Sequence, residues 1–244
     1  MITIFIPAYN EEEYLEKAVT NLVSAARIAG NVKLDVVIVD DASTDKTPQI
    51  IASLKKKYPF VRSIRHTANK GIGSGIREVI AIAKYPKFMI VPGDNDCSKI
   101  LLTKLFHNQH RAEMVLSYYV NKEQRGRFRN FLSTIYGLLY MTTFDVYIQY
   151  FNGVGMYPIK RLRKINLNAN GFSITAEINT KLLRSGCTLY EIPGFMLTGV
   201  EGSGSLTLKN FSEVVITYIR LICEIYWSNH RQFNHRPIRF YEDS

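Results

Sequence analysis

Residues 87–98 read KFMIVPGDNDCS, and this stretch decides the fold that we expect for the chain of 244 residues. The apolar run 88–91 ends at a Pro-Gly pair, a pattern typical of a buried strand that stops at a turn. Asp94 and Asp96 follow in that turn, where open α/β sheets bind their ligands. Two aspartates at this spacing can approach one Mg²⁺ or Mn²⁺ ion. A turn whose aspartates only cap the backbone would have the same sequence.

Towards the N-terminus, buried apolar runs alternate with helical patterns. Strands are predicted over residues 2–6, 34–39 and 61–66, with a helix after each of them. Asn10 and Glu13 have the spacing of a capping box for the first helix. Thr47 and Pro48 are typical of the start of the second helix. The alternation predicts an α/β fold, with a mostly parallel central sheet and helices on both faces.

Polar loops follow the strands of this predicted sheet. Because the carboxyl ends of parallel strands meet at one edge, we expect residues 7–11, 40–45 and 94–96 to gather there. Asp40 can accept hydrogen bonds from a base or ribose, whereas Asp45 is expected to cap a helix. The glycines at 71, 73 and 75 do not match the dinucleotide fingerprint, and there is no GxxxxGK[ST] pattern. These two kinds of nucleotide site are therefore excluded.

The composition restricts the kinds of binding partner that we expect. A net charge of +10 and a pI near 9.4 suggest an anionic partner, such as a nucleotide, a lipid phosphate or a membrane surface. The alternative is that the charge only keeps the protein soluble. Nucleic acid is disfavoured, because the basic residues are not interleaved with aromatic ones. Cys97, Cys187 and Cys223 form no CxxC pair, so we interpret them as reduced thiols of a cytoplasmic protein. We expect neither a signal peptide nor a membrane-spanning helix.

Four segments carry a resemblance to a known family. IPAYNEEEYL, VDDASTD, NKGIGSGI and PGDND resemble, in order and spacing, the nucleotide-sugar-binding half of a family 2 glycosyltransferase with a GT-A fold. The pattern is most similar to the dolichyl-phosphate mannose synthase-like, or polyprenyl-phosphate glycosyltransferase, group. The resemblance implies a GT-A domain over residues 1–205, with a nucleotide-sugar-binding half at 1–120 and an acceptor half at 121–205. Residues 206–244 would form a C-terminal amphipathic helix and a basic tail.

The resemblance also implies donor-binding residues. Asp40 would hold the nucleoside, and Lys70 would lie near the donor, unless it is simply a solvated loop lysine. The first nucleotide-contacting loop would consist of Pro7, Tyr9 and Glu11. Asp94 and Asp96 would hold Mg²⁺ or Mn²⁺ on the diphosphate, with Asp96 counted among the catalytic residues.

In the acceptor half, the resemblance points to three residues. Arg129, counted among the catalytic residues, and the substrate-binding Ser133 fit a pair that approaches the donor diphosphate or the acceptor phosphate. The planar fork of Arg donates two parallel hydrogen bonds to a phosphate. Glu177, on a helix predicted over residues 173–184, would be the general base for a hydroxyl acceptor. If the acceptor is a lipid phosphate, no base is needed and Glu177 would position groups. Its plainer interpretation is a solvated helix charge.

We therefore expect an inverting, metal-dependent hexosyltransferase. It would move a sugar from a nucleoside-diphosphate sugar to a polyprenyl phosphate or a cell-envelope glycan. A non-catalytic binder of nucleotide-sugar or lipid phosphate and a sugar nucleotidyltransferase remain as alternatives.

The C-terminal helix has two interpretations. Its apolar stripe either packs on the domain or docks on the inner face of the cell membrane as a peripheral contact. In the second case, basic residues would lie near anionic headgroups, namely Arg231, Arg236 and Arg239. The stripe consists of Phe211, Val214, Val215, Tyr218, Leu221, Ile222 and Ile225.

Overall fold

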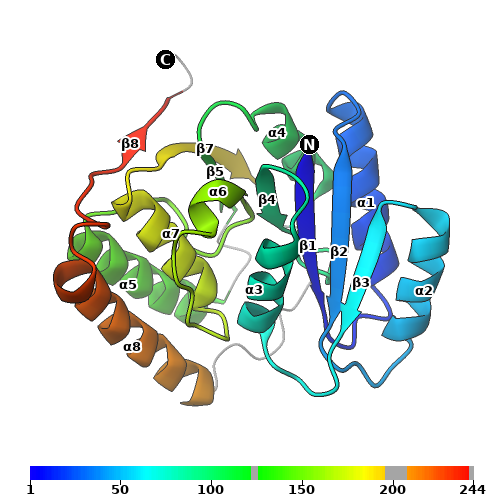
Figure 1. Cartoon of the computed structure of the whole chain (residues 1–244), viewed down its shortest axis with the longest axis horizontal. Coiled ribbons are helices and arrows are strands. Elements are labelled where there is room, and N and C mark those ends of the chain that lie inside the picture. The colour runs from blue at the N-terminus through cyan, green and yellow to red at the C-terminus, as the bar shows by residue number, and fades with distance from the viewer. Residues whose placement is uncertain (122–125, 196–207, 242–244) are drawn as a thin grey trace.

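The computed structural model describes residues 1–121, 126–195 and 208–241, without the side chains of Arg129 and of residues 208–211. Its strands form one sheet in the order β3-β2-β1-β4-β6-β5-β7-β8 (Figure 1). β6 pairs antiparallel with β4 and β5, and the other pairs are parallel. The strands are β1 Ile2–Ala8, β2 Leu34–Asp40, β3 Val61–Arg65, β4 Lys87–Ile90, β5 Met114–Tyr119, β6 Gly155–Pro158, β7 Thr188–Gly194 and β8 Ile238–Arg239.

Helices cover both faces of this sheet, which confirms the predicted mostly parallel α/β architecture (Figure 1). One face carries α1 Leu15–Ile28, α2 Thr47–Lys57 and α4 Lys99–His107. The other carries α3 Ile72–Ile82, α5 Arg127–Phe144, α6 Ile159–Leu162, α7 Ile174–Arg184, α8 Leu208–Cys223 and the π-helical turn η2 Glu224–Ser228. Successive side chains of β1 enter the two cores in turn, since Phe5 lies in one and Ile4 and Ile6 lie in the other.

The start of α1 differs from the prediction. The capping box of Asn10 and Glu13 is wrong, because α1 begins at Leu15 without a side-chain cap. Asn10 has a positive φ of 57°, and its side-chain oxygen accepts a hydrogen bond of 2.9 Å from the backbone N–H of Thr44. The side chain therefore joins two loops instead of capping its own helix.

The start of α2 follows the prediction for Asp45. Its Oδ1 accepts a hydrogen bond of 2.9 Å from the backbone N–H of Thr47, the first residue of α2. The hydroxyl of Thr47 does not cap this helix but accepts from the N–H of Glu11 at 2.8 Å.

The C-terminal helix packs on the domain through part of the predicted stripe. Leu221 and Ile225 are buried, whereas Val215 is exposed. Thr217, which is not part of the predicted stripe, is buried as well. The side chain of Phe211 lies outside the described residues. Tyr218 and Ile222 of the stripe are partly buried and pack against the same core, whereas α8 exposes Val215, Ile216 and Ile219.

The glycines at the start of α3 permit close packing. A Cβ atom on Gly73 would lie 2.1 Å from the backbone oxygen of Ala169, and one on Gly71 would lie 2.6 Å from that of Asn170. Gly71 also has a φ of +81°, which favours glycine. The segment 166–170, called the 166–170 loop below, therefore lies directly against α3.

We predict that Gly73→Ala destabilises the protein by about 1–3 kcal/mol, because the added methyl group forces two backbone segments apart. Urea unfolding followed by circular dichroism would measure this change. The matched control is Gly137→Ala in α5, whose Cβ would meet only Met141 Cε at 4.0 Å. It should leave the stability unchanged or raise it by up to about 1 kcal/mol. Equal stability of both variants would contradict the packing argument.

Candidate active site

The loops at the carboxyl ends of β1 and β2 are joined by hydrogen bonds. The backbone N–H of Glu12 donates to Asp45 Oδ2 at 3.1 Å, and that of Lys46 donates to Glu12 Oε2 at 2.8 Å. The backbone N–H of Asp41 donates to the oxygen of Ala8 at 2.9 Å. Side chains of one loop thus satisfy the backbone of the other, and both loops are held at one edge of the sheet. Pro7, Tyr9 and Glu11 lie there as predicted, with Tyr9 exposed.

Asp40, the last residue of β2, lies buried at this edge with 2% of its surface exposed. Its Oδ1 accepts a hydrogen bond of 2.9 Å from the N–H of Ser43. Its Oδ2 lies 3.4 Å from Arg65 Nε, and it accepts no hydrogen bond from any described residue. Buried carboxylate oxygens normally accept hydrogen bonds, so Oδ2 has capacity for a donor group of a ligand.

The acidic turn after β4 lies against the β1 loop. A Cβ atom on Gly93 would lie 2.6 Å from the backbone oxygen of Pro7. The backbone N–H of Asp96 donates to Asp94 Oδ1 at 3.0 Å, and Asn95 between them has a positive φ of 62°. Asn21 of α1 donates from Nδ2 to Asn95 Oδ1 at 2.8 Å. Sequence reasoning missed Asn21, because nothing in a single helix position signals a contact with a distant turn.

Negative charge accumulates around this turn. Burial, together with the carboxylates of Asp94 and Asp45, raises the pKa of Glu11 to about 7. The neighbouring Cys97 is buried, and burial raises the pKa of its thiol, as expected for a packing residue.

Asp94 and Asp96 fit a cation that is shared with a ligand. In the described parts of the chain, no three His, Cys, Asp or Glu side chains converge on one metal position. Mg²⁺ is commonly bound through one or two carboxylates together with substrate phosphates. The two aspartates and the negative charge around Glu11 suit a cation that also carries a diphosphate.

A buried histidine shapes the loop before α3. The side chain of His66 is 3% exposed, and its Nδ1 lies 2.6 Å from Asp41 Oδ1 and its Nε2 lies 3.1 Å from Glu78 Oε2. The carboxylate of Asp41 also accepts from the backbone N–H groups of Lys70 and Gly71, at 2.8 and 2.9 Å. The sequence alone did not identify the contacts among His66, Asp41 and Glu78. The side chain of Lys70 is half exposed, with Nζ 3.9 Å from Glu78 Oε1.

The structure describes two of the three predicted acceptor side chains, those of Ser133 and Glu177. Ser133 is half-buried in α5, and the side chain of Arg129 lies outside the described residues. The solvated interpretation of Glu177 is wrong, because its side chain is 1% exposed. Its carboxylate accepts from the backbone N–H groups of Asn168 and Ala169 and pairs with Lys181 Nζ at 2.7 Å. An enclosed carboxylate with these partners is poorly placed to take a proton from an acceptor.

We predict that His66 makes the stability of the protein depend on pH. Burial alone lowers the pKa of His66, but Asp41 and Glu78 outweigh it and raise the pKa above the ordinary 6.5. The raised pKa stabilises the fold fully below about pH 6.5, and this contribution is lost as the pH rises through the pKa of the folded state. Urea unfolding at about pH 6 and pH 8.5 should show a smaller loss of stability with pH for His66→Gln than for the parent protein. Identical losses would contradict the assignment.

The sequence is similar to those of known proteins. The sequence model of Glycosyl transferase family 2 matches residues 3–164. The dolichol-phosphate mannosyltransferase of Pyrococcus furiosus is 32% identical over 93 residues, which are 38% of this chain and 25% of that protein. An uncharacterized protein of Methanocaldococcus jannaschii is 26% identical over 234 residues, covering 91% of this chain and 99% of that protein. Several curated relatives are much longer, and mycobacterial ones are matched over 25% of their length.

Solved structures share the fold. Glucosyl-3-phosphoglycerate synthase from Mycobacterium tuberculosis, in complex with Mg²⁺ and UDP, has a TM-score of 0.64 at 17% identity, over 91% of this chain and 79% of that one. S. aureus TarS 1–349 in complex with UDP-GlcNAc has a TM-score of 0.60 at 19% identity, over 93% of this chain and 67% of that one. The fold is that of the GT-A glycosyltransferases. With the family match over most of its length, the chain belongs to Glycosyl transferase family 2.

Proposed function

We propose that this protein transfers a sugar from a nucleoside-diphosphate sugar to an acceptor phosphate, with inversion at the anomeric carbon. The observation that carries this proposal is the buried Asp40 carboxylate, whose Oδ2 accepts no hydrogen bond from the described residues, at the same sheet edge as Asp94 and Asp96. A carboxylate with spare acceptor capacity suits the N–H or O–H groups of a nucleoside. A pair of aspartates suits the diphosphate through a cation.

The donor would lie across the joined loops. Asp40 binds the nucleoside, and Pro7, Tyr9 and Glu11 line the loop beside it. Lys70, on the loop held by Asp41, supplies a positive charge to the donor, because its side chain is half exposed and only distantly paired. Asp94 and Asp96 would hold Mg²⁺ or Mn²⁺, which would supply positive charge to the leaving nucleoside diphosphate.

A phosphate acceptor agrees with the environment of Glu177. A hydroxyl acceptor needs a base to remove its proton, and Glu177 is enclosed by two backbone amides and Lys181. A phosphate oxygen already carries negative charge and needs no base. Direct attack by that oxygen inverts the anomeric carbon, because no enzyme carboxylate intervenes as a nucleophile. A polyprenyl phosphate is therefore favoured over a cell-envelope glycan, and Arg129 and Ser133 are proposed to approach its phosphate.

A lipid acceptor also agrees with an apolar surface on α5 and α8. The two helices lie side by side, and the ring of Tyr218 contacts those of Tyr140 and Phe144 (Figure 1). Both helices also expose large apolar side chains, here called the α5–α8 face. They are Phe128, Phe131, Ile135, Leu138 and Leu139 of α5 and Val215, Ile216 and Ile219 of α8.

The charges around this face favour an anionic bilayer as its partner. α5 contains no acidic residue and begins at the exposed Arg127. Arg231 and Arg236 follow η2 in the sequence and are exposed, with Arg236 Nε 3.7 Å from Asp145 Oδ2. Arg239 pairs with Glu191 at 2.7 Å. No described helix is both long and apolar enough to cross a bilayer. We therefore propose a peripheral contact, in which the α5–α8 face enters the headgroup region of an anionic membrane.

The proposed donor site can be tested by binding measurements. Calorimetric titration with UDP, GDP, CDP and dTDP, each with and without Mn²⁺, should show metal-dependent binding of one diphosphate. Asp96→Ala should abolish metal-dependent transfer and leave the fold intact. Asp40→Asn should weaken diphosphate binding about tenfold or more, because the neutral amide replaces a charged acceptor.

The control for these variants is Glu16→Gln, which removes an exposed partner of Lys57 and should change nothing. Full activity of Asp96→Ala would refute the metal assignment. Release of pyrophosphate would indicate a nucleotidyltransferase, and binding without turnover would indicate a non-catalytic binder.

The proposed membrane contact can be tested with lipid vesicles. The parent protein should sediment with vesicles that contain phosphatidylglycerol and less with vesicles of phosphatidylcholine alone. Leu138→Glu combined with Ile216→Glu should reduce binding by at least about tenfold, because charges replace side chains that enter the bilayer. Ile100→Glu is the matched control, since Ile100 is 69% exposed on α4, on the opposite face of the sheet. An equal loss in both variants would argue against the α5–α8 face.

A further inference from the structure

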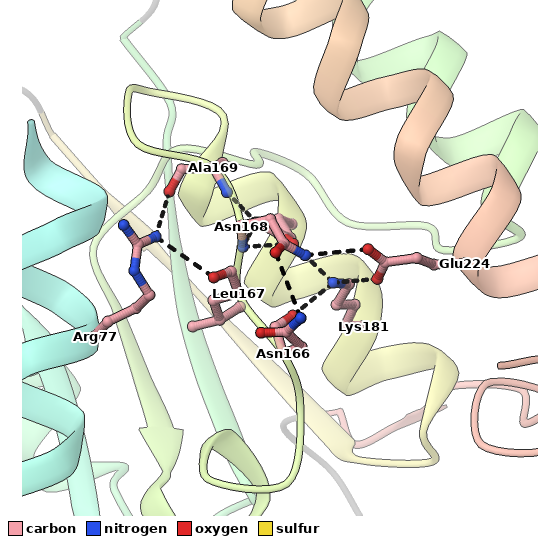
Figure 2. A network of polar contacts seen from close by, with 8 residues as sticks. Arg77, Asn166, Leu167, Asn168, Ala169, Lys181 and Glu224 are labelled. Atoms are coloured by element: carbon pink, nitrogen blue, oxygen red, sulfur yellow. Dashed lines mark hydrogen bonds and ion pairs between the residues drawn. The ribbon is translucent and has the colours of Figure 1, made fainter. Parts of the chain in front are cut away.

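Charged side chains of alternating sign form a series from α3 through α7 to η2. Arg77 lies on α3, Glu177 and Lys181 lie on α7, and Glu224 begins η2. Lys181 is fully buried, and its ammonium group contacts Glu177 Oε1 at 2.7 Å, Glu224 Oε2 at 2.5 Å and the backbone oxygen of Asn166 at 2.6 Å (Figure 2). All three of its donor hydrogens therefore have an acceptor.

The 166–170 loop lies between the charges of this series. On one side, the backbone N–H groups of Asn168 and Ala169 donate to Glu177, at 3.0 and 2.8 Å to Oε2. On the other side, Arg77 Nη1 donates to the backbone oxygen of Ala169 at 2.8 Å, and Nη2 donates to the side chain of Asn170. The amide groups thus point to an anion and the carbonyl groups to a cation (Figure 2). This orientation fixes the loop electrostatically.

The same loop sets the position of the start of α3. The backbone N–H of Gly73 donates to the oxygen of Asn170 at 2.9 Å. The glycines at 71 and 73 bring that loop into direct contact with α3. Lys70 immediately precedes this contact. A displacement of the 166–170 loop would therefore move the loop that carries Lys70.

Glu224 extends the connection to the C-terminal helix. Its Oε1 accepts from Asn168 Nδ2 at 3.1 Å, while its Oε2 pairs with Lys181. η2 directly continues α8, which forms part of the α5–α8 face. A single polar chain thus links the donor loop with the helix proposed to contact the membrane.

We propose that Glu177 is a positioning residue, which acts with Arg77, Lys181 and Glu224 to hold the 166–170 loop, and through it Lys70, in the geometry that binds the donor. This inference rests on the proposed function for its effect on the donor. It replaces the general-base role expected from the family resemblance, and it assigns functions to Arg77, Lys181 and Glu224.

The test separates positioning from base catalysis. Glu177→Gln retains the shape of the side chain but removes the charge that faces two backbone amides and Lys181. The Kd of the Mn²⁺ complex of whichever diphosphate binds the parent protein (UDP, GDP, CDP or dTDP) should rise about tenfold. At saturating donor, kcat should stay within about threefold of the parent value, and the pH profile of kcat should keep its shape. The opposite result would be a fall in kcat of about a hundredfold with an unchanged Kd, together with loss of the rise of kcat with pH. It would overturn the proposal, since the loss of a general base has these effects.

Two further variants make the result independent of the folding of Glu177→Gln. Arg77→Gln acts on the opposite side of the 166–170 loop, from a partly exposed position, and should raise the same Kd. Glu113→Gln is the matched control, because Glu113 pairs with Arg161 at 3.1 Å and accepts from the backbone N–H of Thr188 without touching the loop. It should lower the unfolding midpoint but leave the Kd unchanged. An equal rise in Kd for Glu113→Gln would reduce the effect to general destabilisation and overturn the proposal.

Hydrogen exchange gives a readout that does not need a donor. In Glu177→Gln and Arg77→Gln, the backbone amides of residues 70–75 and 166–170 should exchange faster than in the parent protein and in Glu113→Gln. Unchanged exchange at residues 70–75 would refute the coupling. If the parent protein binds no diphosphate, the proposed function fails, and faster exchange at residues 70–75 would still support the positioning of this loop.

Discussion

The parallel pairing of β1 with β2 on one side and with β4 on the other is the constraint on which the rest of the structure depends. The register places Ala8 beside Asp40 and Phe5 beside Ile90, so three strands end at one edge. The loops that leave this edge carry backbone N–H groups without sheet partners, and oxygens of neighbouring loops accept from them. Many of these oxygens belong to carboxylates. The groups that hold the loops together therefore also make the edge negative, which suits a cation, and through that cation a diphosphate.

The charged residues of the second half of the molecule are arranged differently. Around Glu177 and Lys181 the charges are buried and alternate in sign, and each has several hydrogen-bond partners. Burying such groups is costly unless every donor and acceptor is satisfied, and removing one member leaves the others uncompensated. A network of this kind tolerates little displacement. It gives the C-terminal helix a defined position relative to the donor loop, although the two are far apart in the sequence.

Local patterns predicted the sheet, its direction and the acidic edge, because apolar runs and turn residues act within a few positions of one another. Asp40, Asp94 and Asp96 could be identified because they follow such runs directly. Contacts between distant segments could not be predicted in this way. Asn10 has the spacing of a capping residue whether it turns to its own helix or to Thr44. Glu177 resembles a solvated charge until the fold brings Glu224 and the 166–170 loop to α7, and the apolar stripe of α8 likewise depends on what α5 covers.

The place of β6 in the sheet has a consequence for how the chain folds. β1 to β4 assemble from successive segments, so this half can form as it leaves the ribosome. β5 does not join β4 directly, because β6, formed much later in the sequence, lies between them. Until residues 155–158 are synthesised, β4 presents an open edge to other chains. Closure of this long loop should therefore limit the folding rate of the second half, and the nascent chain is most prone to aggregation in that interval.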